Sequence, residues 1–316
     1  MTPEFDLIAK YFSRVPKRAS LGVGDDCALL TATPGLEMAI STDTLVAGTH
    51  FFPDADPRDL GHKALAVNLS DLAAMGAVPR AVLLALTLPQ VNDAWLSEFA
   101  GGFWALANEY DVDLIGGDTT RGPLSMTLTV IGEVEQGRAL KRSGAKADDD
   151  LWVSSTVGGA ALALMHMKGQ VRLADADASA MASLLHRPRP RVALGRALQG
   201  LANAAIDISD GLMADVGHLC ECSGLGAVIE WDRIPMPKTL GEQPGEIRQA
   251  CALAGGDDYE LAFTAPAAKR DAIAALAQAT RIGAMRRDVN GVTVIDREGR
   301  TMPLSRRGYD HFGAAG

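Results

Sequence analysis

Acidic side chains recur beside serine, threonine and glycine at separate points along the chain. They stand in Gly-Val-Gly-Asp-Asp (22–26), Ser-Thr-Asp-Thr (41–44), Gly-Gly-Asp-Thr-Thr (116–120), Ile-Asp-Ile-Ser-Asp-Gly (206–211) and Gly-Gly-Asp-Asp (255–258). Carboxylates, hydroxyls and water are hard oxygen ligands, which suit Mg²⁺ or Ca²⁺ better than zinc or copper. Crowded carboxylates repel one another and take up protons unless divalent cations neutralise them. The pattern therefore indicates acids that hold metal ions, and metal ions that hold phosphates.

Any one of these aspartates also has a simpler explanation, because Asp commonly caps helices and occupies turns. Asp210, which precedes Gly-Leu-Met, is well placed to be a helix N-cap. Capping does not explain why Asp recurs after Gly-x-Gly, after Ser-Thr, after Gly-Gly and within Ile-Asp-Ile-Ser-Asp-Gly. The recurrence favours a functional site.

Other phosphate-binding motifs are missing from the sequence, which has no Gly-x-x-x-x-Gly-Lys-Ser/Thr loop. Gly22-Val-Gly24 lacks the third glycine of the dinucleotide fingerprint and leads into an acid pair, which would repel a pyrophosphate unless a metal ion intervened. An ordinary P-loop protein is therefore excluded, and a nicotinamide enzyme is disfavoured. Arg121 and Arg142 are the best candidates for direct phosphate contacts, because arginine offers a bidentate fork.

Histidine, cysteine and tyrosine give weaker signals. Cys220 and Cys222 follow His218 at spacings of two, but residues two apart on a helix point about 200° away from each other, which favours ordinary thiols over a zinc site. His50 follows the Asp43 segment and could contact a substrate, or it could be an ordinary core or surface histidine. Tyr309 could stack on a heterocycle or fix the C-terminal tail.

The composition is that of a folded, acidic protein. The chain has 316 residues, of which 47% are hydrophobic and 22% charged, and a formal net charge of −9. This length allows two domains or one large one. The acidity argues against a nucleic-acid partner, which needs a basic face, and no apolar run approaches the roughly 18 residues of a membrane span. The N-terminus lacks the apolar core of a signal peptide, so we expect a cytoplasmic protein with no membrane partner.

Segments of strand-like and helix-like periodicity alternate along the chain, which predicts a mixed α/β class. Residues 112–115 are predicted as a short strand that opens into a glycine turn at 116–120, and residues 268–279 as a helix. The charged, aperiodic stretch 137–150 is interpreted as a connection between domains. The first half has Ser-Thr-Asp and then Gly-Gly-Asp, and the second has Ser-Asp and then Gly-Gly-Asp-Asp, which two related halves would explain.

The motifs are more specific in combination. They are, in chain order, Gly-Val-Gly-Asp-Asp-Cys-Ala-Leu-Leu (22–30), Ser-Thr-Asp-Thr-Leu-Val (41–46), Leu-Ala-Val-Asn-Leu-Ser-Asp-Leu-Ala-Ala-Met-Gly-Ala (65–77), Gly-Gly-Asp-Thr-Thr-Arg-Gly (116–122), Ile-Asp-Ile-Ser-Asp-Gly-Leu (206–212), Gly-Gly-Asp-Asp-Tyr-Glu-Leu (255–261) and Gly-Tyr-Asp-His-Phe (308–312). This series resembles the bacterial thiamine-monophosphate kinases, a family of the aminoimidazole ribonucleotide synthetase superfamily. The resemblance spans essentially the whole chain.

The resemblance implies a two-domain α/β fold of α+β type, like that of aminoimidazole ribonucleotide synthetase. Residues 1–140 would form an N-terminal domain that binds ATP and magnesium and pairs with a second subunit into a dimeric β-barrel. Residues 141–316 would form a C-terminal α/β domain that completes the active site. The implied reaction is ATP-dependent phosphorylation of thiamine monophosphate to thiamine pyrophosphate, with several Mg²⁺ ions, ATP as co-substrate and a homodimer as the assembly.

The resemblance also assigns roles residue by residue. The implied ATP contacts are Gly117, Asp118, Arg142 and Ser209, the implied contacts to thiamine phosphate are His50, Asp257 and Tyr309, and the implied magnesium ligands are Asp26, Ser41, Thr42, Asp43, Asp71, Asp118, Asp207 and Asp210. One residue departs from the family pattern, because Asp257 stands where the family commonly has Glu. The shorter side chain is expected to reach the substrate through water.

This chemistry requires no nucleophilic or basic side chain. A phosphate monoester is already ionised at neutral pH, with a second pKa of about 6, so neutralisation and in-line positioning suffice. The sequence leaves two alternatives open. One is another ATP-using enzyme of the superfamily, such as an aminoimidazole ribonucleotide synthetase, whereas selenophosphate synthetase would need a reactive N-terminal cysteine. The other is a non-catalytic Mg²⁺ or nucleotide sensor.

Overall fold

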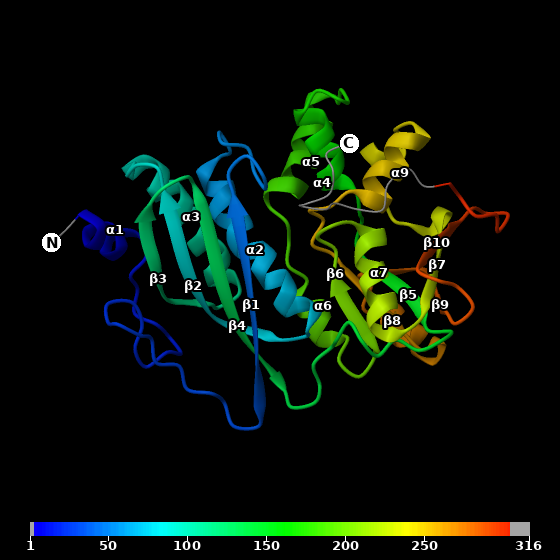
Figure 1. Ribbon diagram of the computed structural model, residues 1–316, viewed down its shortest axis with the longest axis horizontal. Helices are drawn as coiled ribbons and strands as arrows, with labels where there is room; N and C mark the ends of the chain where they lie inside the picture. Colours follow the sequence, from blue (N-terminus) through cyan, green and yellow to red (C-terminus); the bar gives the residue numbers. More distant parts are fainter. Residues whose placement is uncertain (1–2, 304–316) are drawn as a thin grey trace. The chain divides into compact units, whose positions relative to one another are not determined.

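The computed structural model describes residues 3–303 and divides into two compact units (Figure 1). The first unit comprises the described residues of Met1–Leu72 together with Ala77–Gly137. The second comprises Ala73–Gly76 together with the described residues of Arg138–Gly316. The expected two-part organisation is thus present, while the boundary at residue 140 stays a prediction.

A four-stranded sheet with covering helices makes up the first unit. In chain order its elements are α1 (Pro3–Tyr11), β1 (Leu36–Val46), α2 (Pro57–Ala74), β2 (Val78–Leu88), α3 (Asp93–Glu109), β3 (Asp113–Arg121) and β4 (Ser125–Glu135). The strand order is β1-β4-β2-β3. β4 pairs antiparallel with β1 and β2, and β2 pairs parallel with β3. β1 and β3 are therefore the two edges of the sheet.

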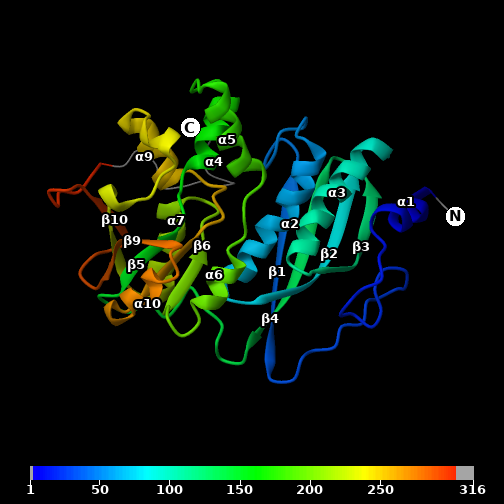
Figure 2. The same cartoon turned by 180° about the vertical axis from the view of Figure 1, so that it is seen from behind.

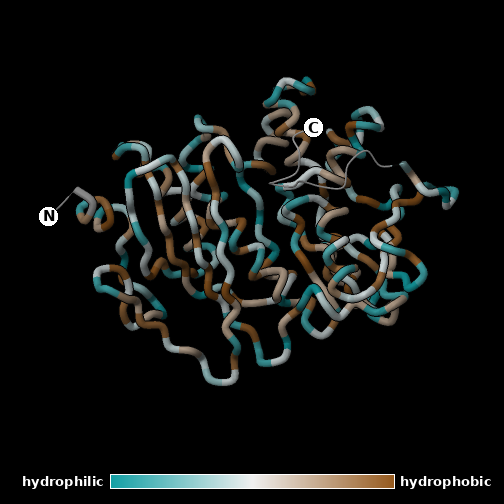
Figure 3. Tube along the Cα trace, in the orientation of Figure 1, coloured by the Kyte–Doolittle hydropathy of each residue, from teal (hydrophilic) through white to brown (hydrophobic). Residues whose placement is uncertain are grey.

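The two faces of this sheet differ in what covers them. Helices α2 and α3 lie on one face, as the two opposite views show (Figures 1 and 2), and Leu128 and Val130 of β4 are fully buried there. On the other face Met38 and Ile40 of β1 are 43% and 61% exposed. Figure 3 shows both hydrophobic and hydrophilic residues along the strands of this sheet, as expected where one face of a sheet is buried and the other is more exposed.

A six-stranded sheet forms the centre of the second unit, in the order β10-β7-β9-β5-β8-β6. β10 pairs parallel with β7, and the remaining neighbours are antiparallel. Its elements are β5 (Asp150–Ser154), α4 (Gly159–Met167), α5 (Asp175–His186), α6 (Val192–Ala197), β6 (Ala204–Asp207), α7 (Leu212–Ser223), β7 (Gly226–Glu230), η1 (Trp231–Arg233), α8 (Lys238–Gly241), α9 (Gly245–Ala254), β8 (Leu261–Ala265), η2 (Ala267–Lys269), α10 (Arg270–Ala274), β9 (Ala279–Arg286) and β10 (Val292–Ile295).

The sequence pattern predicts that the strand ends before Gly116 and Gly117. In the structure the strand continues through both glycines. β3 continues to Arg121, with Gly117 opposite Leu84 and Asp118 opposite Ala85. A Cβ atom on Gly117 would lie 1.9 Å from the Leu84 carbonyl oxygen, so only glycine fits there. A register shift between Val82 and Leu83 accompanies this close approach. The glycines therefore mark a bulge inside a strand, which is a common use of glycine in sheets.

The predicted helix over residues 268–279 is confirmed only for its first part, because the helical residues end at Ala274. A short turn and the five-residue helix α10 fill its first part, and Ala279 already begins β9. β9 pairs with β5 on one side and β7 on the other. Pairing with two strands from distant parts of the chain outweighs the helix propensity of an alanine-rich stretch.

The four cysteines lie in different environments. Cys27 and Cys222 are exposed, whereas Cys220 and Cys251 are buried. Burial raises the pKa of Cys220 to about 11 and that of Cys251 to about 12. Because the thiolate is the reactive form, we expect two thiols to react with a maleimide in the native protein at pH 7.5 and all four after denaturation. Peptide mass spectrometry checks which two react, and early labelling of Cys251 would contradict the structure.

None of the helices within residues 3–303 is both long enough and apolar enough to cross a membrane.

Candidate active site

Polar side chains of β1 meet α2 on the helix-covered face of the first sheet. The Ser41 hydroxyl donates a hydrogen bond of 2.6 Å to the Asp71 carboxylate. Two residues along the strand, the Asp43 N–H donates to the Asn68 side-chain oxygen at 3.1 Å. Residues i and i+2 of a strand share a face, so Ser41 and Asp43 both point towards α2. The structure thus brings together three of the predicted metal ligands.

Thr42 and Asp118 occupy the opposite face of the same sheet. The Thr42 hydroxyl donates 2.8 Å to the Leu128 carbonyl oxygen and lies 2.6 Å from the Thr129 hydroxyl. The exposed Asp118 pairs with the exposed Ala85 of β2. Neither side chain lies on the face where Ser41 contacts Asp71.

Asp118 is also far from Asp43 within one chain. Asp43 is on the edge strand β1 and Asp118 on the edge strand β3, with β4 and β2 between them. Neighbouring strands are about 4.8 Å apart, so three spacings separate the two residues by about 14 Å. One metal ion, with oxygen ligands about 2 Å away, cannot join both aspartates of a single sheet.

Asp26 and His50 lie in loops of the first unit. Asp26 is in an exposed turn, where its N–H donates to the Asp25 carboxylate at 2.9 Å. His50 follows β1 and accepts a hydrogen bond of 3.0 Å from the Val46 N–H at Nδ1. A neutral imidazole that accepts at Nδ1 carries its proton on Nε2. His50 therefore binds the backbone at the end of β1 through Nδ1, and its Nε2 carries a hydrogen-bond donor.

In the second unit, two acidic loops lie side by side. We call residues 208–211 the Ser209 loop and residues 255–260 the Asp257 loop. The Asp257 N–H donates 2.9 Å to the Ser209 carbonyl oxygen, and the Tyr259 N–H donates 2.8 Å to the Ile208 carbonyl oxygen. A Cβ atom on Gly256 would lie 2.3 Å from the Ser209 carbonyl oxygen. The second glycine of Gly-Gly-Asp-Asp therefore permits the loops to touch, which brings Asp257 next to Ser209.

The position of Asp210 in the sequence suggested that it caps the N-terminus of α7, but in the structure it does not. The cap residue is Gly211, which offers no side chain. Asp215, in the first turn of α7, instead accepts hydrogen bonds from the Ser209, Asp210 and Gly211 N–H groups, each 3.1 Å long. Burial and the neighbouring Asp210 charge raise the pKa of Asp215 to about 6. Sequence reasoning missed this residue, although an acid in a first helical turn is a known signal.

The Asp257 loop has an unusual backbone and a second buried acid. Asp257 and Tyr259 have φ angles of 68° and 51°, a region that non-glycine residues rarely occupy. The Tyr259 hydroxyl donates 3.1 Å to the Asp257 carboxylate. Asp258 accepts a hydrogen bond of 2.8 Å from the Gly158 N–H at the start of α4. Burial, with the charges of Glu260 and Asp257, raises the pKa of Asp258 well above its usual value.

A buried ion pair anchors the far end of the Asp257 loop. Arg191 contacts both carboxylate oxygens of Glu260, with its Nε 2.7 Å from one of them. The Ser154 hydroxyl donates to the same carboxylate and accepts a hydrogen bond of 2.8 Å from the Leu261 N–H. Such bidentate arginine pairs fix orientation strongly, so the loop is held at both of its ends.

The raised pKa of Asp258 makes the free energy of unfolding depend on pH. The unfolded chain releases the Asp258 proton near the ordinary pKa of Asp, about 4, whereas the folded chain releases it at higher pH. The stability that protonated Asp258 contributes is therefore lost as pH rises above about 4. Asn at this position keeps the acceptor and does not titrate. We therefore expect the Asp258→Asn variant to lose less stability than the wild type between pH 4 and pH 8, as urea titrations would measure. Parallel slopes would contradict the burial of this carboxylate.

The remaining predicted residues are placed as follows. Asp207 ends β6 and is 5% exposed. Arg142 is exposed in the connection before β5, where its carbonyl oxygen accepts a hydrogen bond of 3.2 Å from the Ser223 hydroxyl. Tyr309 lies outside the described residues.

Within residues 3–303, no three Asp, Glu, His or Cys side chains gather closely enough to hold a metal ion. The donor chemistry nevertheless suits Mg²⁺, because Ser41 and Asp71 and the Ser209 and Asp210 side chains of the Ser209 loop supply only oxygen. The predicted ligands thus occur as separate groups, of which Ser41, Asp43 and Asp71 form one.

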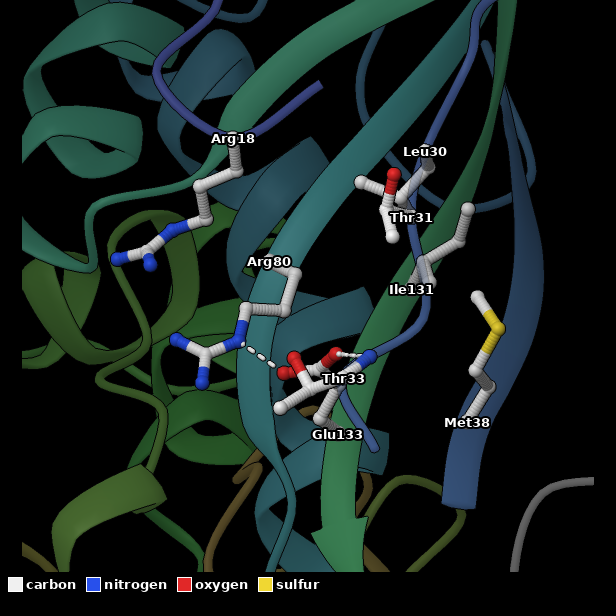
Figure 4. Close-up of a pocket in the computed structure, with 8 residues that line it drawn as sticks. All are labelled: Arg18, Leu30, Thr31, Thr33, Met38, Arg80, Ile131 and Glu133. Carbon is white, nitrogen blue, oxygen red and sulfur yellow. Dashed lines mark hydrogen bonds and ion pairs between the residues drawn. The ribbon is translucent and has the colours of Figure 1, made fainter. Parts of the chain in front are cut away.

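A pocket on the first unit contains none of the predicted residues. Figure 4 shows it between β2, β4 and the segment that precedes β1, lined by Arg18, Leu30, Thr31, Thr33, Met38, Arg80, Ile131 and Glu133. The Arg80 Nε donates 2.7 Å and the Thr33 N–H donates 3.1 Å to Glu133. Burial alone would raise the pKa of Glu133, but these two contacts outweigh it and lower the pKa. The ion pair thus joins β2 to β4, and the hydrogen bond from the Thr33 N–H ties the preceding segment to β4.

Comparison with known proteins defines the class of this fold. Residues 24–134 match the N-terminal domain, and residues 146–294 the C-terminal domain, of the AIR synthase related proteins. The chain is 51% identical to the thiamine-monophosphate kinase of Escherichia coli K12 over 98% of each sequence. It therefore belongs to the thiamine-monophosphate kinase family, and it is a kinase.

Solved structures agree with this assignment. The thiamine-monophosphate kinase of Stenotrophomonas maltophilia K279a superposes with a TM-score of 0.84 at 44% identity, covering 94% of this chain and 96% of that one. A structure described as AaThiL complexed with AMPPCP and TMP superposes with a TM-score of 0.79 at 29% identity, covering 89% of each chain. The expected aminoimidazole ribonucleotide synthetase-like fold is confirmed.

Proposed function

We propose that this kinase transfers the γ-phosphoryl group of ATP to thiamine monophosphate and so forms thiamine pyrophosphate. The observation that supports this most directly is the contact between the Ser209 loop and the Asp257 loop. The hydrogen bond from the Asp257 N–H to the Ser209 carbonyl oxygen joins the proposed ATP contact to the proposed contact for the acceptor. A kinase needs donor and acceptor held in fixed proximity.

In the proposed reaction the acceptor phosphate attacks the γ-phosphorus directly. Ser209, Gly117, Asp118 and Arg142 bind the nucleotide, and His50, Asp257 and Tyr309 orient the acceptor. Asp26, Ser41, Thr42, Asp43, Asp71, Asp118, Asp207 and Asp210 would hold several Mg²⁺ ions, which neutralise the phosphates when bound. No side chain forms a covalent intermediate, because the ionised acceptor is itself the nucleophile. Inversion of configuration at a chiral γ-phosphate is the expected result, and retention would refute direct transfer.

The proposed assembly is a homodimer that shares its active sites. Two copies of the four-stranded sheet would close a β-barrel with the faces opposite α2 and α3 inward and a two-fold axis along the barrel. The edge strand β3 of one copy would then lie beside the edge strand β1 of the other. The strand order supports this arrangement, because β1, which carries Asp43, and β3, which carries Asp118, are the two edges of the sheet and would be neighbours only across the junction between two copies. The exposed Met38 and Ile40 would be buried in it.

An acceptor panel tests the proposed reaction. The protein is incubated with Mg-ATP and either thiamine monophosphate, thiamine or a formylglycinamidine ribonucleotide, and products are separated by chromatography. We expect thiamine pyrophosphate and ADP in equal amounts from the first, and no product from the others. A cyclised imidazole product would favour the superfamily alternative, and ATP binding without any turnover would favour a sensor.

A further inference from the structure

Asp215 is a buried carboxylate to which the proposed reaction gives no role. It is 3% exposed and lies in the first turn of α7. One of its oxygens, Oδ2, accepts all three hydrogen bonds from the Ser209, Asp210 and Gly211 N–H groups. An oxygen so occupied is poorly suited to bind a metal ion as well. Asp210, in contrast, takes part in this network through its backbone N–H.

The rest of the loop backbone is also paired. The Ile208 N–H donates 2.8 Å to the Glu260 carbonyl oxygen, and the Ile208 and Ser209 carbonyl oxygens accept from the Tyr259 and Asp257 N–H groups. Backbone polar groups that are buried must find partners. In the Ser209 loop Asp215 supplies the partner for three consecutive donors, so its charge sets the direction in which the loop turns into α7.

The consequence concerns the side chains that the loop presents. Asp215 holds the backbone of the Ser209 loop on one side, and the Asp257 loop holds it on the other. The backbone positions that carry the Ser209 hydroxyl and the Asp210 carboxylate are therefore fixed. A carboxylate at a helix N-terminus is further stabilised by the helix dipole, and hydrogen bonds to an ionised acceptor are stronger than those to a neutral one. An amide oxygen at position 215 can take the place of Oδ2, but it carries no charge and is a weaker acceptor.

We propose that Asp215 is a positioning residue, which orients Ser209 and Asp210 for the magnesium–nucleotide complex without touching it. This inference rests on the proposed function, since it assigns the Ser209 loop to the nucleotide. Loss of an outer partner of a metal ligand typically costs about 10–100-fold in affinity or activity. The Asp215→Asn variant should therefore lower kcat by about 10–100-fold and raise the Mg²⁺ concentration for half-maximal rate by about tenfold.

Asp150→Asn is a matched control, because it also replaces a buried, charged carboxylate by an amide. Asp150 is 1% exposed and pairs with Arg270 and Arg281 on other strands and helices of the same unit. It makes none of the contacts of the Ser209 loop. We expect Asp150→Asn to lower the melting temperature at least as much as Asp215→Asn, while kcat per folded molecule and the Mg²⁺ requirement stay those of the wild type.

The outcomes separate the positioning role of Asp215 from the proposed function. Unchanged kcat and Mg²⁺ dependence in folded Asp215→Asn, or equal kinetic losses in the Asp150→Asn control, would overturn the positioning role. If Asp215→Asn does not fold, Asp215→Glu retains the charge and is measured instead, and failure of both to fold makes Asp215 a structural residue. If the wild type binds Mg-ATP but makes no thiamine pyrophosphate, the proposed function fails while weaker nucleotide binding by Asp215→Asn still supports the inference. A wild type that does not bind Mg-ATP refutes both.

Discussion

A mixture of two inactive variants, Asp43→Asn and Asp118→Asn, is expected to recover activity when their subunits are exchanged. Each variant alone should lose about 10³-fold in kcat, because each removes a carboxylate from a site that stabilises charge on the transferred phosphoryl group. In a symmetric dimer with shared sites, a mixed dimer has one site with both substitutions and one with neither. Random reassortment makes half the dimers mixed, so about a quarter of wild-type activity should return.

The measurement is the rate of thiamine pyrophosphate formation after the two purified variants are mixed, dissociated in mild denaturant and returned to buffer. Each variant treated alone is the control and should stay inactive. Absence of recovery, with mixed dimers demonstrated by differently tagged subunits, would contradict shared sites. It would require Asp43 and Asp118 to act in the same chain, which the strand order of the first sheet does not favour.

Asp71→Asn should damage activity far more than folding. Its carboxylate accepts a hydrogen bond of 2.6 Å from the Ser41 hydroxyl, and an amide oxygen can accept the same bond, so the free energy of unfolding should change by about 1 kcal/mol or less. Loss of the charge should lower kcat by about 100-fold or more, because a magnesium ligand is weakened. Urea titration and initial rates at several Mg²⁺ concentrations measure the two effects.

Ser41→Ala serves as the partner control for this prediction. It removes the same hydrogen bond but keeps the Asp71 charge, so its activity should fall less than that of Asp71→Asn. If Asp71→Asn instead unfolds the protein whether or not Mg²⁺ is present, Asp71 is a structural residue that fixes α2 to β1. The assignment of Asp71 as a metal ligand would then be wrong.

Local sequence predicted most of what depends on local structure. The alternation of hydroxyl and apolar residues along β4 is the pattern of a strand with one buried face, and every second residue from Met126 to Val130 is buried. Glycine was harder to interpret. Gly116 and Gly117 resemble a turn in sequence, yet they are strand residues that allow β3 to approach Leu84 closely. That use is visible only when the neighbouring strand is known.

The predictions that failed or were missed depended on distant contacts. β9 follows an alanine-rich stretch and is a strand because β5 and β7 flank it. Asp215 stands in a first helical turn, which is a sequence signal, but its three partners are backbone groups that only the folded loop brings to it. The strand order that separates Asp43 from Asp118 likewise arises from pairing between β1 and β4, whose partners Asp43 and Leu128 are far apart in the sequence. The motifs supplied the candidate site residues, and the strand order determines how far apart those of the first sheet lie.

Transfer of labelled phosphate tests the central proposal most directly. The protein is incubated with ATP that carries a radioactive γ-phosphate, Mg²⁺ and thiamine monophosphate, and the products are separated and counted. We expect one label in the terminal phosphate of thiamine pyrophosphate for each ADP formed, with none in inorganic phosphate. Label that appears only as inorganic phosphate, with the thiamine monophosphate unchanged, would contradict it.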